Sequence, residues 1–97
     1  MKLNLNKPLL DLDGNAVVQG GEEVILGKFL AAALAAGKAD EPIKFMDWAF
    51  KLHKEGEIEI DNADMDKMKS FVNEHQGMTV IAKGSLLKCF SEAENAA

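Results

Sequence analysis

The chain has 97 residues, of which 47% are apolar, and its 16 acidic side chains outnumber its 11 basic ones, giving a formal net charge of −5. This length is typical of one domain with its own core, and the apolar fraction excludes a largely disordered chain. Because every basic residue is a lysine and the lysines are scattered, the composition argues against a nucleic-acid partner.

Three further absences in the sequence bear on where the protein works. The one cysteine, Cys89, has no intrachain partner for a disulfide. The first residues lack a signal-peptide pattern, and the longest apolar stretch, 24–36, is too short to cross a bilayer. We therefore expect a cytoplasmic protein without a membrane partner.

The N-terminal part has the pattern of short strands. Residues 2–5 alternate polar and apolar, and Asp13-Gly14-Asn15 separates the apolar stretch 9–12 from the β-prone residues 16–18. Asp-Gly between apolar stretches is typical of a hairpin turn. The sequence therefore predicts an N-terminal β-hairpin.

A first helix is predicted over about 23–36. Gly20-Gly21 interrupts the strand pattern, and Glu22 and Glu23 suit the positive N-terminal end of a helix. The segment is rich in alanine, the best helix former, and Gly37 follows it as a C′ residue. Small side chains allow close approach, so we expect this helix to pack tightly.

A second helix is predicted over about 42–54, with Pro42 in its first turn and Gly56 after its end. Its apolar residues cover more than half of the circumference, so the helix is either central or keeps one face for a partner. They form two rows, Ile43, Met46 and Phe50 on one side and Phe45, Trp48, Ala49 and Leu52 on the other.

The next segment combines a strand with a third helix. Residues 57–60 alternate strictly, which predicts a strand able to join the N-terminal strands in one small sheet. Asp61 or Asn62 then caps a helix that ends before Gly77.

A fourth helix is predicted from about residue 80 to 90 or 91, with Thr79 as its cap. Gly84 inside it lowers helix propensity, which indicates a close helix crossing there. Residues 92–97 are expected to be a frayed tail, so the domain is predicted to span 1–91. The predicted fold class is α+β, with an N-terminal hairpin and a short strand in a small sheet packed with about four helices.

The stretch 9–22 also resembles a calcium-binding loop. Such a loop needs oxygen ligands at positions 1, 3, 5, 9 and 12 and a glycine at position 6. Here position 6 is Ala16, and a strand pattern with Pro8 leads into the loop instead of a helix. A hairpin is favoured, and calcium stays an alternative with five candidate ligands, Asp11, Asp13, Asn15, Gln19 and Glu22.

Nothing in the sequence has the pattern of a catalytic site. His53 and His75 lie near predicted helix ends, Ser85 is not in a nucleophile motif, and Cys89 lies near a helix C-terminus, which does not activate a thiol. Gly20-Gly21 lacks the remainder of a nucleotide-binding motif, and acidic residues follow it. We predict neither an enzyme nor a cofactor.

Protein binding is the better supported prediction. Three of the six aromatic residues lie on the second predicted helix, and tryptophan is enriched in binding hot spots. Methionines at 46, 65, 68 and 78 are able to line an adaptable groove. The predicted partner-binding residues are Phe45, Trp48 and Leu52.

Three segments resemble small proteins of tailed phages and prophages. They are the opening KLNLNKPLLDLDGN, the middle IKFMDWAFKLHKEGEIEID and the closing MTVIAKGSLLKCF. The resemblance implies an assembly chaperone, a structural accessory or an inhibitor of host defence, acting in the host cytoplasm, and it carries over no functional residue.

The sequence thus predicts a non-enzymatic protein–protein interaction module or a homo-oligomer, and a phage-encoded accessory or assembly protein is one context for it. Two alternatives remain, the calcium module and an acidic decoy that fills a basic groove of a host protein. A decoy would use the carboxylates that crowd the middle of the chain, Asp40, Glu41, Glu55, Glu57, Glu59, Asp61, Asp64 and Asp66.

Overall fold

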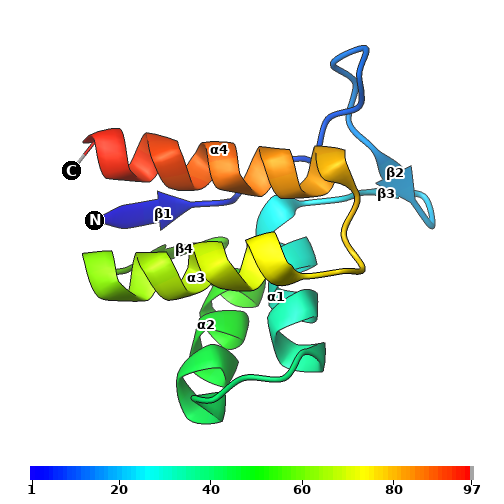
Figure 1. Ribbon diagram of the computed structural model, residues 1–97. Coiled ribbons are helices and arrows are strands. Elements are labelled where there is room, and N and C mark those ends of the chain that lie inside the picture. The colour runs from blue at the N-terminus through cyan, green and yellow to red at the C-terminus, as the bar shows by residue number, and fades with distance from the viewer. Residues whose placement is uncertain (97) are drawn as a thin grey trace. The chain divides into compact units, whose positions relative to one another are not determined.

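The computed structural model describes residues 1–96, which form four helices and two small antiparallel two-stranded sheets (Figure 1). The predicted α+β class is confirmed. The elements in chain order are β1 (Lys2–Asn4), β2 (Val18–Gln19), β3 (Glu22–Glu23), α1 (Leu26–Ala36), α2 (Pro42–Glu55), β4 (Glu57–Glu59), α3 (Asn62–Glu74) and α4 (Val80–Ala96).

The chain divides into two compact units. One comprises Asn4–Ile58, and the other combines Met1–Leu3 with the chain from Glu59 onward. No helix within residues 1–96 has both the length and the apolar character that crossing a bilayer requires.

The strand predicted over 57–60 is β4, and it pairs with β1. The backbone N–H of Leu5 donates to the carbonyl of Gly56 at 2.7 Å, and that of Ile60 donates to the carbonyl of Met1 at 2.8 Å. The β2–β3 pair is a separate sheet, so the strands form two small sheets where we expected one.

Residues 8–25 form the predicted hairpin and then a second one. The N–H of Val17 donates to the carbonyl of Leu9 at 2.8 Å, and the N–H of Val24 donates to the carbonyl of Val17 at 2.8 Å. The second hairpin turns at Gly20 and Gly21, whose φ angles of 60° and 83° suit a tight turn between β2 and β3.

This second hairpin corrects the predicted start of the first helix. Glu22 and Glu23 belong to β3, and α1 begins only at Leu26. The paired glycines are a two-residue hairpin loop and do not lead directly into a helix, because both adopt the positive φ that such a loop needs. Gly37 follows α1 as predicted but is extended, with φ −82°.

Helices α1 and α2 run antiparallel and pack against one another (Figure 1). Gly27 at the start of α1 allows the closest approach, because a Cβ there would lie 3.2 Å from the Cα of Gly56 and 3.2 Å from the carbonyl oxygen of Leu52. Gly56, with φ 73°, ends α2 as predicted, and its N–H donates to the carbonyl of Leu52.

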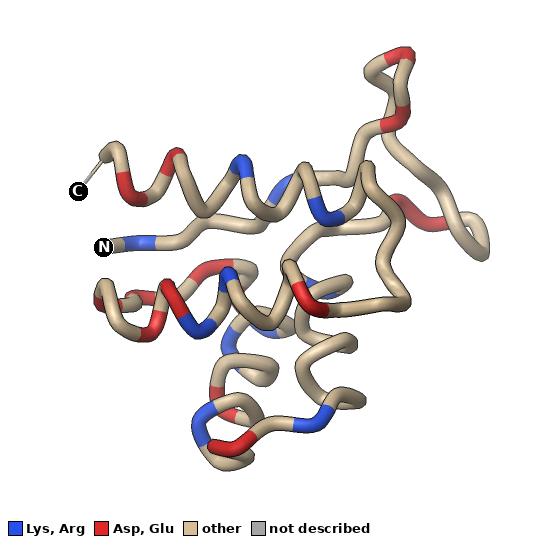
Figure 2. The backbone as a smooth tube through the Cα atoms, in the orientation of Figure 1, with Lys and Arg blue, Asp and Glu red and all other residues tan. Residues whose placement is uncertain are grey.

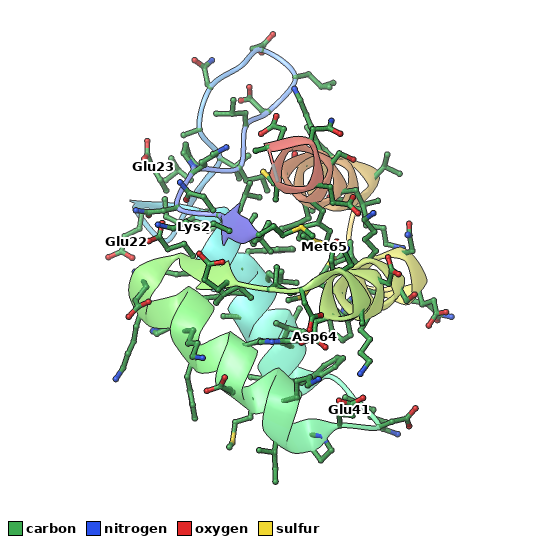
Figure 3. All side chains as sticks on the ribbon, turned by 90° about the vertical axis from the view of Figure 1, so that its left-hand side faces the viewer. Lys2, Glu22, Glu23, Glu41, Asp64 and Met65 are labelled. Atoms are coloured by element: carbon green, nitrogen blue, oxygen red, sulfur yellow. The ribbon has the colours of Figure 1, made fainter. Side chains whose placement is uncertain are left out.

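Helices α3 and α4 also lie side by side and antiparallel (Figure 1). The predicted caps are confirmed: a carboxylate oxygen of Asp61 accepts from the N–H of Asp64 at 2.7 Å, and the Thr79 hydroxyl accepts from the N–H of Ala82 at 3.2 Å. Met65 is fully buried and points from α3 toward α4 (Figure 3).

Helix α4 differs from its prediction in two respects. It continues to Ala96 where a frayed tail from Glu92 was expected; Ala93 is buried in this last part, and Glu94 forms an ion pair with Lys69. Gly84 does not mark a helix crossing, because a Cβ added there would meet nothing within 4 Å.

Candidate protein-binding surface

The two apolar rows of α2 have opposite environments. Trp48 is 6% exposed and Leu52 is fully buried, whereas Phe45 is half-buried with its ring centroid 4.9 Å from that of Trp48. The predicted partner-binding residues therefore lie on the more buried side of the helix. Whether they bind a partner stays a prediction.

The other row of α2 is open to solvent. Ile43 is 79% exposed, Met46 49% and Phe50 59%. We call these three residues the α2 row. They are spaced i, i+3 and i+7, so they form one continuous stripe along the helix. Three large exposed apolar groups in one stripe are unusual on a surface that only meets water.

A groove of about 330 Å³ lies between this row and α1. Four of its eight lining residues are alanines, whose side chains consist of a single Cβ. Met46 and Phe50 form its wall on the side of the α2 row. The lining consists of Lys28, Ala31, Ala32, Ala35, Met46, Ala49, Phe50 and His53.

Lys28 and His53 are the ionisable residues of the groove. Within residues 1–96 the side chain of neither takes part in a hydrogen bond or an ion pair. No carboxylate lines the groove, and the acid that follows Met46, Asp47, is already paired with Lys51 at 3.0 Å. The groove therefore combines apolar walls with two side chains able to carry positive charge.

Most of the methionines considered as a groove lining are core residues. Met65 and Met68 are fully buried and Met78 is 9% exposed, which leaves Met46 as the groove methionine. The sequence shows both apolar rows of α2, but the predicted partner-binding residues belong to the other row. Charged residues directly after members of the α2 row, Asp47 after Met46 and Lys51 after Phe50, were the signal for its exposure.

The residues considered for catalysis are far from a reactive arrangement. His75 Nδ1 accepts the N–H of Gly77 at 3.0 Å, and its ring meets the edge of Phe71. The Ser85 hydroxyl donates to the carbonyl of Ile81 at 2.7 Å, and Cys89 is buried. In the described residues neither histidine is hydrogen-bonded to a hydroxyl, thiol or carboxylate.

The calcium candidates lie on the two successive hairpins. One carboxylate oxygen of Asp11 accepts the N–H of Asp13 at 3.0 Å and that of Asn15 at 2.9 Å, which closes the first loop. Gln19 and Glu22 face each other across the second turn, and Glu22 points outward (Figure 3). Residues 1–96 hold no group of three or more acidic, histidine or cysteine side chains arranged for a metal ion.

Six of the eight acidic residues in the middle of the chain lie between Lys54 and Lys67 with no lysine among them, and the other two, Asp40 and Glu41, precede Lys44 (Figure 2). Glu41 and Asp64 form ion pairs one helical turn apart, Glu41 with Lys44 at 3.4 Å and Asp64 with Lys67 at 3.9 Å. The decoy hypothesis requires a dense acidic surface, and these pairs reduce the charge that such a surface would present.

Comparison of the chain with protein-family models, curated proteins and solved structures finds no match. The geometry of the α2 row and its groove is therefore the basis for a functional proposal.

Proposed function

We propose that this protein is a non-enzymatic interaction module that docks a protein partner on the α2 row and the adjoining groove. The observation that carries the proposal is the stripe formed by Ile43, Met46 and Phe50, whose side chains are 79%, 49% and 59% exposed. Covering such a stripe removes apolar surface from water, at about 25 cal/mol for each Å² buried.

The buried row of the same helix supports this assignment of the surface. Trp48 and Leu52 tie α2 into the core, so the exposed row is held on a regular helix instead of a loop. A preformed surface loses little conformational entropy when a partner binds. The α2 row thus meets the requirements of a binding site better than the mostly buried residues predicted from the sequence.

The proposal is tested by capturing partners with a single change on the α2 row. Phe50→Asp places a charge where a partner would bury the ring, and Leu12→Asp makes the same kind of change at a side chain that is 97% exposed on the first hairpin. Both variants are first checked for a native circular dichroism spectrum. The resemblance to phage proteins makes lysate of induced or infected cells the first source.

We expect a specific partner that Phe50→Asp loses and Leu12→Asp retains. With that partner purified, the Phe50→Asp variant is expected to bind about thirtyfold more weakly, which corresponds to a hot spot of about 2 kcal/mol. Retained binding by Phe50→Asp would contradict the proposal, and loss in Leu12→Asp would move the site to the hairpin. Light scattering on the wild type tests whether a second copy is the partner.

A further inference from the structure

We propose that the partner segment in the α1–α2 groove is an amphipathic helix that presents a carboxylate to Lys28 and His53. This inference rests on the proposed function, and it adds the shape and the charge of the occupant.

The spacing of the exposed residues favours a helix. Ile43, Met46, Phe50 and His53 follow one another at intervals of three, four and three, which is the pattern of a helix surface that packs along a second helix. An extended peptide would instead need free backbone groups at a sheet edge. Helices α1 and α2 offer side-chain ridges, so a partner helix lying along α2 is the complementary shape.

The depth and size of the groove agree with this occupant. Four of its eight lining residues are alanines from the two helices, and small residues allow the ridge of a third helix to approach closely. Its volume of about 330 Å³ is at the lower end of the range for small-molecule pockets. The exposed stripe extends beyond the groove to Ile43, which is 79% exposed and does not line it. A partner helix that is longer than the groove covers both the groove and Ile43.

Charge complementarity specifies the partner further. An apolar helix that buried Lys28 and His53 without a counter-charge would strip two polar side chains of water, which is costly. A carboxylate at the edge of the partner's apolar row removes that cost and gains a charge-assisted hydrogen bond. Within residues 1–96 no acid is paired with either side chain, so the counter-charge is expected from the partner.

A second copy of the chain is the weaker occupant. A symmetric dimer through this groove would place two copies of Lys28 and of His53 in one interface, and Asp47, which follows Met46, is already paired with Lys51 at 3.0 Å. The two copies would therefore match in apolar surface but not in charge.

Two synthetic peptides test the inference. They share one row of leucines at i, i+3 and i+7 and differ only in the residues beside it, which are glutamates in the first and lysines in the second. Each is titrated into the full-length isotope-labelled protein, and binding is followed by changes in amide NMR shifts. We expect the acidic peptide to bind at least about tenfold more tightly, a difference of about 1.4 kcal/mol.

Two charge-reversal variants test whether the preference for the acidic peptide comes from the groove. Lys28→Glu is expected to abolish or reverse it, whereas Lys88→Glu, a matched charge change at a residue that does not line the groove, is expected to leave it unchanged. Phe50→Asp is expected to weaken both peptides. Raising the salt concentration should shrink the preference, because exposed charges are screened.

Different results would overturn the acidic helical occupant and the proposed docking on the α2 row. Equal binding of both peptides, lost in Phe50→Asp, would overturn the acidic occupant and leave apolar docking intact. Absence of binding by either peptide, with a captured partner that still depends on Phe50, would overturn the helical occupant. A wild-type dimer that Phe50→Asp converts to monomer would make a second copy the occupant and overturn the inference.

Discussion

Trp48 and Phe50 are two positions apart on α2, yet their side chains are 6% and 59% exposed. We expect Trp48→Ala to lower the free energy of unfolding by about 3–5 kcal/mol, because it removes a large buried side chain and leaves a cavity. Phe50→Ala is expected to change it by about 0.5 kcal/mol or less, as at other surface positions. Urea denaturation of the two variants measures both values, and similar losses would contradict the burial of one and the exposure of the other.

The burial of Trp48 and the exposure of Phe50 also decide which of the two residues should be substituted to test partner binding. A protein of this size has about 5–15 kcal/mol of stability in total, so truncating Trp48 endangers the fold itself. Loss of a partner in that variant would not separate a binding defect from unfolding. Phe50 is the better position because it is large, exposed and beside the groove.

Asp11 is the residue on which the calcium alternative depends. One of its carboxylate oxygens already accepts two backbone N–H groups of its own loop. We expect Asp11→Ala to lower the free energy of unfolding by about 0.5–1.5 kcal/mol for loss of these hydrogen bonds. Asp13→Ala is the control, because the Asp13 side chain accepts neither of them.

Calcium itself provides the second measurement on this loop. We expect millimolar calcium chloride or a chelator to leave the melting temperature of the wild type unchanged. A ligand that binds only the folded state stabilises it by RT ln(1 + L/Kd), where L is the free ligand concentration, so an upward shift of the melting temperature with calcium would restore the metal hypothesis.

At the scale of elements, the α1–α2 pair depends on a glycine. A Cβ at Gly27 would approach three backbone atoms at 3.2–3.3 Å, among them the carbonyl oxygens of Leu5 and Leu52. We expect Gly27→Ala to destabilise the protein by about 1–3 kcal/mol, as overpacking does in other cores.

The matched control is Gly84→Ala in α4. A Cβ there meets nothing within 4 Å, and alanine has the higher helix propensity, so we expect it to stabilise the protein by about 0.5–1 kcal/mol. Thermal or urea unfolding of both variants provides the comparison. A Gly27→Ala variant that is as stable as the wild type, or more stable, would contradict the close approach at Gly27.

Four helices and the first hairpin were predictable because their signals are local. Proline at the start of α2, glycine at its end, and side-chain caps at Asp61 and Thr79 act within one helical turn. The β2–β3 hairpin was missed because two glycines are equally suited to a helix entry and to a two-residue turn. The hydrogen bonds that Val24 makes with Val17 and with Leu9, which lie 7 and 15 residues earlier in the chain, decide between these possibilities.

At the scale of the whole molecule, Met1–Leu3 belong to the same compact unit as the residues from Glu59 onward, which are far away in the sequence. Leu3 is fully buried, and Leu12 is 97% exposed. We expect Leu3→Ala to cost about 2–5 kcal/mol of unfolding free energy and Leu12→Ala to cost little. Hydrogen exchange should show reduced protection over residues 59–96 in Leu3→Ala, and unchanged protection there would contradict this division of the chain.

Net charge and local charge act differently on the proposed partner. A protein with a net charge of −5 repels an acidic helix at a distance, although the Lys28 ammonium would attract a carboxylate at contact and His53 offers it a hydrogen-bond donor. Salt screens the long-range repulsion within about 10 Å at ordinary ionic strength. Lys28 and His53 are therefore expected to affect specificity and the rate of dissociation more than the rate of encounter.

The sequence by itself determined the α+β class, the helix boundaries at strong caps and the presence of two apolar rows on α2, because these follow from periodicity and from groups within a few residues. Only the tertiary structure decided which row is buried, that Gly27 and not Gly84 is the point of close approach, and that a groove adjoins Phe50. The physical reason is that burial of a helix face depends on which other element covers it, and that element comes from a distant part of the chain.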